Sequence, residues 1–143
     1  MDVELLKVDF MEPAIRKLNT DSLILIFNKL PAADLVRTER VCRAWRKIAK
    51  QSWSTFKKLS LDPRELGLRT IGTGHVYPYI NNDVIEKILK RCGKYLLEFD
   101  QKEYCYDCLL LVANHCKNIQ SINCYQISLE GIEELSQNCS NIK

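Results

Sequence analysis

Three stretches of the chain repeat one pattern of apolar and polar positions. Each stretch closes on a cysteine, and large aliphatic residues stand seven and four positions before Cys92, Cys116 and Cys139. This spacing gathers apolar side chains on one face of a helix, so we expect a helix before each cysteine. The cysteines follow one another at intervals of 24 residues (92 to 116) and 23 residues (116 to 139). A repeat of this length is typical of stacked repeat proteins, which present extended binding surfaces.

A second apolar pattern accompanies these helices. Residues 56–61, 96–101 and 119–124 carry the spacing L-x-x-L-x-L, with Gln101 and Cys124 in last places, and this spacing predicts one short strand per repeat. Because side chains alternate between the two faces of a strand, one set is expected to face the core: Leu59, Leu61, Phe99, Ile122 and Cys124. The opposite, concave face then exposes a mixed polar set: Lys58, Ser60, Glu98, Asp100, Ser121 and Asn123.

The first sixty residues carry a helical pattern of their own. A first helix is expected to begin after Asn19 or Thr20, either of which suits a helix cap, and to end at Pro31. Its apolar stripe consists of Leu23, Ile26, Phe27 and Leu30. A short second segment follows, and a further stripe predicts a third helix: Val41, Trp45 and Ile48. Three short helices bury little surface alone, so we expect this unit to pack against a neighbouring domain or protein.

The residues of these helices resemble the F-box family. The likeness rests on Leu18-Asn-Thr-Asp-Ser-Leu23-Ile-Leu-Ile-Phe27-Asn-Lys-Leu30-Pro, on Asp34-Leu35, on Val41-Cys-Arg-Ala-Trp45 and on Trp53; the departure is Asn19, where the family usually has proline. The resemblance implies binding to the Skp adaptor of Skp–cullin–F-box ubiquitin ligases. Carried over by position, the adaptor-binding residues are Leu18, Asn19, Leu23, Ile26, Phe27, Leu30 and Leu35. Val41 and Trp45 are expected to hold the three helices together.

The later residues are similar to the cysteine-containing leucine-rich repeats that follow F-boxes in F-box/leucine-rich-repeat proteins. The two resemblances imply an α+β chain: a three-helix F-box and then a short α/β leucine-rich-repeat solenoid. We expect an N-terminal extension at 1–14, the F-box at 15–56 and about three repeats at 57–143. The last repeat looks incomplete, so we expect the chain to be a fragment, or a short product, of a longer array.

The combined resemblance implies a substrate-recognition subunit without catalysis of its own or any cofactor. The F-box would bind the Skp adaptor, and the concave face from Lys58 to Asn123 would bind an unknown target protein for ubiquitin-dependent degradation. The alternative is a repeat scaffold that binds proteins without directing their degradation. No set of residues with the spacing of a nucleophilic, phosphate-binding or paired-carboxylate site is visible.

Composition narrows the range of partners. Hydrophobic residues make up 46% of the 143 residues, enough for a packed core, and the net charge of +3 is too small to argue for nucleic acid. The basic row from Arg37 to Lys58 leaves a nucleic-acid-binding helix open, although a solvated helix face explains it more simply. No apolar run is long enough to span a bilayer, and the acidic N-terminus is unlike a signal peptide. We therefore expect a protein of the cytoplasm, the nucleus or both.

Seven cysteines fit a reducing compartment, where they act as small core residues. A zinc site remains the alternative for Cys105 and Cys108 with His115 and Cys116, and a redox C-x-x-C is a further one. The glycines and prolines of residues 63–78 predict a loop that carries His75 as an exposed side chain. Contact of this loop with a target is a further hypothesis.

Overall fold

The computed structural model of the chain describes residues 17–68, 80–101, 108–125 and 127–143. The expected N-terminal extension, most of the expected loop at 63–78 with His75, and Cys105 lie outside the described residues. The described part is an α+β structure in which helices come first and then alternate with three short strands.

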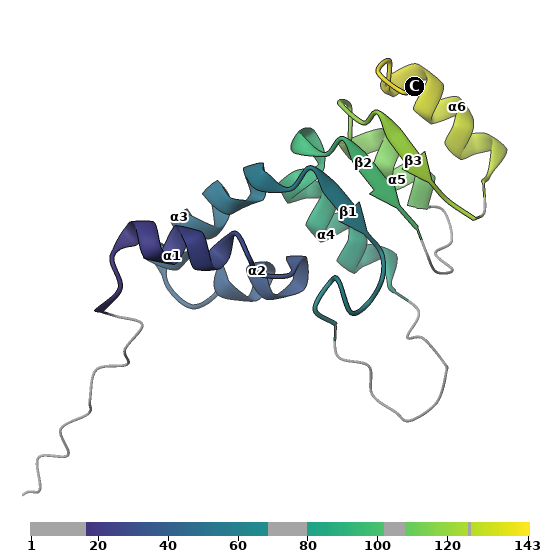
Figure 1. Cartoon of the computed structure of the whole chain (residues 1–143). Coiled ribbons are helices and arrows are strands. Elements are labelled where there is room, and N and C mark those ends of the chain that lie inside the picture. The colour runs from purple at the N-terminus through teal and green to yellow at the C-terminus, as the bar shows by residue number, and fades with distance from the viewer. Residues whose placement is uncertain (1–16, 69–79, 102–107, 126) are drawn as a thin grey trace, which may run out of the picture.

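The first unit consists of three helices, as the apolar stripes predicted. They are α1 (Thr20–Phe27), α2 (Ala32–Thr38) and α3 (Arg43–Ser52), and α1 and α2 both pack on α3 (Figure 1). Asn19 caps α1: its side-chain oxygen accepts a hydrogen bond of 2.8 Å from the backbone N–H of Ser22. Pro31 stands at the N-cap of α2, where its missing N–H costs no helical hydrogen bond. A short 3-10 turn, η2 (Trp53–Thr55), continues α3.

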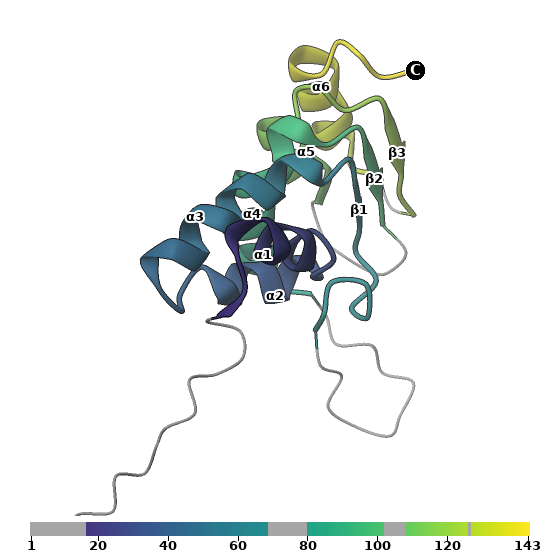
Figure 2. The same cartoon turned by 60° about the vertical axis from the view of Figure 1, so that its left-hand side comes forward.

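The second unit alternates strands and helices. Its elements are β1 (Lys58–Ser60), α4 (Asn82–Cys92), η3 (Gly93–Tyr95), β2 (Glu98–Asp100), α5 (Cys108–His115), β3 (Ser121–Asn123) and α6 (Leu129–Asn138). The strands form one parallel sheet in the order β1-β2-β3, and the helices α4, α5 and α6 line one side of it (Figures 1 and 2). Three helices thus end at or next to the three periodic cysteines, as predicted.

The register of the sheet confirms the predicted alignment of the strand segments. Leu59 lies opposite Phe99, and Phe99 lies opposite Ile122. The backbone repeats with the same period: the N–H of Leu97 donates to Lys57 O at 2.8 Å, and that of Gln120 donates to Leu97 O at 2.8 Å. Equivalent residues of successive repeats therefore occupy equivalent places in one ladder.

One hydrophobic core runs through both units. It includes Phe27 and Leu35 of the first helices, Trp53 at their end, and the buried cysteines Cys92 and Cys116 of the repeats. The sequence left two possibilities for the apolar stripe of the first helices: binding to another protein, as the F-box resemblance implies, or an entirely internal position. The structure favours the internal position for Leu23 and Phe27, which are buried in the chain's own core where α1 packs on α3, whereas Ile26 is 42% exposed.

The last helix is the exception within the repeat pattern. Ile85 of α4 and Leu109 of α5 are 0% and 3% exposed, whereas their counterpart Ile132 of α6 is 47% exposed. Leu109 is covered from the side of α6, since a Cβ on Gly131 would come within 2.7 Å of the Leu109 Cβ. Ile132 has no such cover from the described part of the chain, which accounts for its greater exposure.

This difference gives a direct test of the stacking. Leu109→Ala removes buried methyl groups and leaves a cavity, so it should lower the free energy of unfolding by about 2–5 kcal/mol. Ile132→Ala alters a half-exposed position and should cost less than about 1 kcal/mol. Urea unfolding followed by circular dichroism measures both. Equal losses for the two variants would contradict the stacking of α5 under α6.

Candidate functional site

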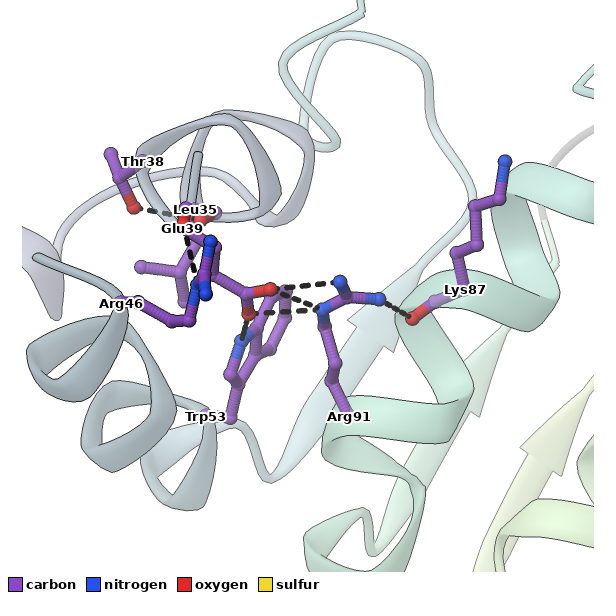
Figure 3. A network of polar contacts seen from close by, with 7 residues as sticks. All are labelled: Leu35, Thr38, Glu39, Arg46, Trp53, Lys87 and Arg91. Carbon is purple, nitrogen blue, oxygen red and sulfur yellow. Dashed lines mark hydrogen bonds and ion pairs between the residues drawn. The ribbon is translucent and has the colours of Figure 1, made fainter. Parts of the chain in front are cut away.

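A buried carboxylate joins the first unit to the repeats. Glu39 follows α2 directly, and its side-chain oxygen Oε1 accepts a hydrogen bond of 2.7 Å from the indole Nε1 of Trp53 (Figure 3). The guanidinium of Arg91, on α4, donates to the same carboxylate from Nε at 2.9 and 3.0 Å and from Nη2 at 2.8 Å. Arg91 also donates from Nη1 to the backbone oxygen of Lys87 at 2.7 Å. Residues from three elements thus meet at one point.

The charge of Glu39 is maintained by these donors. Burial alone would raise the pKa of its carboxyl group, but hydrogen bonds from Arg91 and Trp53 and the positive charges of Arg91 and Lys50 outweigh that effect and lower the pKa below its ordinary value of 4.5. The backbone oxygen of Glu39 accepts a further hydrogen bond of 3.0 Å from Nε of Arg46 on α3 (Figure 3). The site is an ion pair with full hydrogen bonding and no visible catalytic arrangement.

A second contact ties α2 to the segment after β1. The backbone N–H of Ala33 donates to Leu66 O at 2.9 Å. Gly67 follows with a φ of +75°, and a Cβ there would lie 2.8 Å from the Pro31 Cβ, so only glycine fits this close approach without strain. The first unit is therefore held to the repeats from two sides.

The seven expected adaptor-binding residues fall into two groups. Leu23, Phe27 and Leu35 are buried in the core, and the Phe27 ring packs edge-to-face on Trp45 with centroids 5.2 Å apart. Because these three side chains lie in the core of the protein, they offer no surface to a partner. The other group remains accessible: Leu18, Asn19 and Ile26 are exposed, and Leu30 is half-buried.

Exposed aliphatic side chains nevertheless remain on α1. Leu25 is 68% exposed and lies beside the exposed Ile26, while Leu18 is exposed just before the helix. We call Leu18, Leu25 and Ile26 the α1 outer surface. Leu25 was not among the predicted residues, although it is three positions from Ser22 and four from Lys29 and so stands on an otherwise polar helix face.

Val41 also differs from its expected place. It was expected to hold the helices together, but it is 61% exposed in the turn before α3. Trp45 does meet that expectation through its contact with Phe27.

The polar face of the sheet is ordered by contacts between its own residues. Lys58 Nζ lies 3.6 Å from Glu98 Oε2 on the neighbouring strand, and Asn123 Nδ2 donates to Asp100 Oδ1 at 3.1 Å. Lys58, Glu98, Ser121 and Asn123 are exposed and Asp100 is half-buried, as expected for a surface. Ser60 is a correction, since it is only 7% exposed.

The cysteines of the repeats are core residues. Cys92 and Cys116 are fully buried free thiols, and burial raises the pKa of each to about 12, so neither forms a thiolate near neutral pH. Cys108 departs from the expected reduced state, because it is disulfide-bonded. Among the described residues no group of three or more histidine, cysteine or acidic side chains is placed to hold a metal ion. Within the same residues, no helix is long and apolar enough to cross a membrane.

Comparison with known proteins identifies the first unit. The family model F-box-like matches residues 20–66, which cover α1, α2, α3 and β1. No curated protein matches the chain. Domains of the matched family bind the Skp adaptor of Skp–cullin–F-box ubiquitin ligases and typically lack catalytic activity. The chain therefore carries an F-box-like domain followed by alternating helices and three short parallel strands.

Glu39→Gln tests the ion pair at the junction. The substitution removes the charge that compensates Arg91, so we expect a loss of about 1.5–3 kcal/mol in the free energy of unfolding at pH 7. Because the pKa of Glu39 is lowered in the folded state, its contribution is present above pH 4.5 and is lost as the pH falls through the folded value. Urea titrations between pH 7 and pH 3 should therefore show the gap between wild type and variant closing at low pH.

The matched control is Glu86→Gln. Glu86 pairs with Lys90 at 2.9 Å on the surface of α4, and this exposed pair should change stability little. A Glu39→Gln variant that is as stable as the control at pH 7 would contradict the account.

Proposed function

We propose that the chain is a substrate-recognition subunit of a Skp–cullin–F-box ubiquitin ligase. The observation that carries the proposal is the F-box-like match at residues 20–66 together with an exposed aliphatic surface on the first helix of that match. The F-box (15–56) binds the Skp adaptor, and the repeats (57–143) bind a target protein. The proposed localisation of the protein is the cytoplasm, the nucleus or both.

The α1 outer surface is the proposed centre of adaptor binding. Leucine and isoleucine side chains that are exposed together on one helix are typical of a binding surface. A groove on a partner protein would bury them away from water. Asn19 and Leu30 border this helix at its two ends and complete the contact. The buried Leu23, Phe27 and Leu35 contribute indirectly, because they belong to the core in which α1 and α2 pack on α3.

The repeats are proposed to be leucine-rich repeats of the cysteine-containing type. Support comes from the parallel register of β1, β2 and β3, from the helices on one side of the sheet, and from the buried Cys92, Cys116 and Cys139 at equivalent places. The proposed contact with a target consists of the exposed Lys58, Glu98, Ser121 and Asn123 and the half-buried Asp100, and Ser60 supports β1 beside them.

Placing the adaptor and the target on one chain has a kinetic consequence. Once both are bound, the target lies at a fixed distance from the ligase, and ubiquitin transfer becomes effectively intramolecular. The hydrogen bonds from Arg91 to Glu39 support this arrangement, since they join α4 to the first unit.

Adaptor binding is tested by Leu25→Asp/Ile26→Asp. Two charges on the α1 outer surface should weaken binding to the Skp adaptor by about a hundredfold or more, because desolvating an unpaired carboxylate is costly. Circular dichroism should show an intact fold, as both side chains are exposed. The measurement is calorimetric titration of the purified adaptor.

Leu129→Asp provides the control for this experiment, since Leu129 is 81% exposed on α6 at the far end of the chain. It should bind the adaptor like the wild type. The proposed surface is wrong if the α1 double variant retains wild-type affinity, or if Leu129→Asp loses as much.

A non-degradative scaffold is the second candidate function, favoured by the small number of strands available to hold a target. Affinity capture with and without proteasome inhibition should provide bound proteins, which are then added to a reconstituted ligase. We expect at least one bound protein to be ubiquitylated with the wild-type chain, and to remain bound but unmodified with Leu25→Asp/Ile26→Asp. Bound proteins that are never modified would establish the scaffold instead.

A further inference from the structure

A groove separates the first unit from the edge of the sheet. It has a volume of about 460 Å³, and one wall is the turn between α1 and α2 while the other is β1. We call it the β1 groove. The lining residues are Asn28, Lys29, Leu30, Pro31, Ala32 and Thr55 through Ser60, with Glu65 and Leu66. In Figure 1, β1 is the strand of the sheet nearest to α1 and α2, so its outer edge faces them.

The outer edge of β1 lines this groove, with Lys58 exposed and Ser60 7% exposed. Lys57 O accepts hydrogen bonds from the N–H groups of Leu97 and Glu98, and the N–H of Leu61 donates to Asp100 O. Backbone groups alternate in direction along a strand, so residues 57, 59 and 61 point toward β2 and residues 58 and 60 point toward the groove. In the described part of the chain, no hydrogen bond joins the backbone of Lys58 or Ser60 to a residue outside the sheet. Such an edge is a template for an added strand.

The charged side chains around the groove favour a bound segment of negative charge. Three of the lining side chains are cationic (Lys29, Lys57 and Lys58) and one is acidic (Glu65), which gives 3 − 1 = +2. Lys29 has no ion pair among the described residues, and Lys57 Nζ lies 5.7 Å from the centre of the Tyr95 ring. Lys58 contacts Glu98 at 3.6 Å with 60% of its side chain exposed, so it remains open to a second acid.

The apolar part of the wall suits the alternate side chains of a strand. Leu30, Pro31 and Phe56 line the groove together with Leu59 and Leu66. The wall also contains Asn28, whose side-chain oxygen is shut off from solvent and lacks a hydrogen-bond partner among the described residues. A segment that alternates acidic and aliphatic residues therefore matches both the charges and the apolar surface.

We propose that an extended acidic segment of the target protein binds in the β1 groove and adds a fourth strand to the free edge of β1. This inference rests on the proposed function, and it names the chemistry of the target that the repeats receive. Main-chain hydrogen bonds to Lys58 and Ser60 provide affinity, and acids opposite Lys29, Lys57 and Lys58 provide selectivity. The segment would lie next to the exposed sheet residues proposed above as the target contact.

The test uses two ten-residue fluorescent peptides, one alternating glutamate with valine and one alternating lysine with valine, titrated by anisotropy against the chain in complex with the Skp adaptor. The acidic peptide should bind at least about tenfold more tightly than the basic one, and more weakly as salt is raised. Ser60→Pro removes the N–H that faces the groove and should weaken binding about tenfold. Ser60→Ala removes the side-chain hydroxyl, as Ser60→Pro also does, but keeps the backbone N–H, so it should bind the acidic peptide like the wild type.

A charge pair of variants completes the design. Lys58→Glu should weaken the acidic peptide about tenfold, whereas Lys87→Glu, on the exposed side of α4, should not. The proposal is overturned if the acidic peptide fails to bind the wild type, if it binds Ser60→Pro and Ser60→Ala equally, or if a 20-base-pair DNA duplex displaces it and binds Ser60→Pro unchanged. Binding of the Skp adaptor, measured on the same samples, separates the proposed function from the groove proposal. If the wild-type chain does not bind the adaptor, the proposed function is wrong. If it binds the adaptor but not the acidic peptide, only the groove proposal is wrong.

Discussion

The arrangement of the molecule depends on the burial of one carboxylate, that of Glu39. A buried charge is stable only when donors surround it in a narrow geometry, and here Trp53 and Arg91 supply them from η2 and α4. Because the partners come from both units, the hydrogen bonds can form in only one relative orientation. The core around Leu35 and Trp53 lies next to the junction, where the Glu39 side chain is 12% and the Arg91 side chain 31% exposed, and this partial burial strengthens the bonds.

This constraint changes how the first unit is understood. The sequence suggested two separate apolar surfaces. The surface of the first helices was expected to bind another subunit, and those of the repeats were expected to pack against each other. In the structure, Leu23 and Phe27 belong to the shared core, whereas Leu18, Leu25 and Ile26 are exposed. The proposed adaptor surface and the sheet therefore belong to one structure with a shared core.

Periodic features were predictable from the sequence, and contacts between distant residues were not. The cysteine period located α4, α5 and α6, and the alignment of Leu59 with Phe99 and Ile122 anticipated the register of the sheet. No local signal marks Glu39, because its partner Arg91 is 52 residues away. The exposure of Leu25 and the burial of Ser60 were missed for a similar reason: a helical or strand period shows that faces exist but not which neighbour covers each face.

The central claim is that a folded chain with a single core binds the Skp adaptor through the outer face of α1. Amide hydrogen exchange of the chain, with and without the adaptor, tests it most directly. The account predicts new protection confined to residues 18–30, with exchange in β2, β3 and α4–α6 unchanged. It would be contradicted if the adaptor left α1 unprotected, or if binding increased exchange in α4 and η2, since the junction at Glu39 would then have opened.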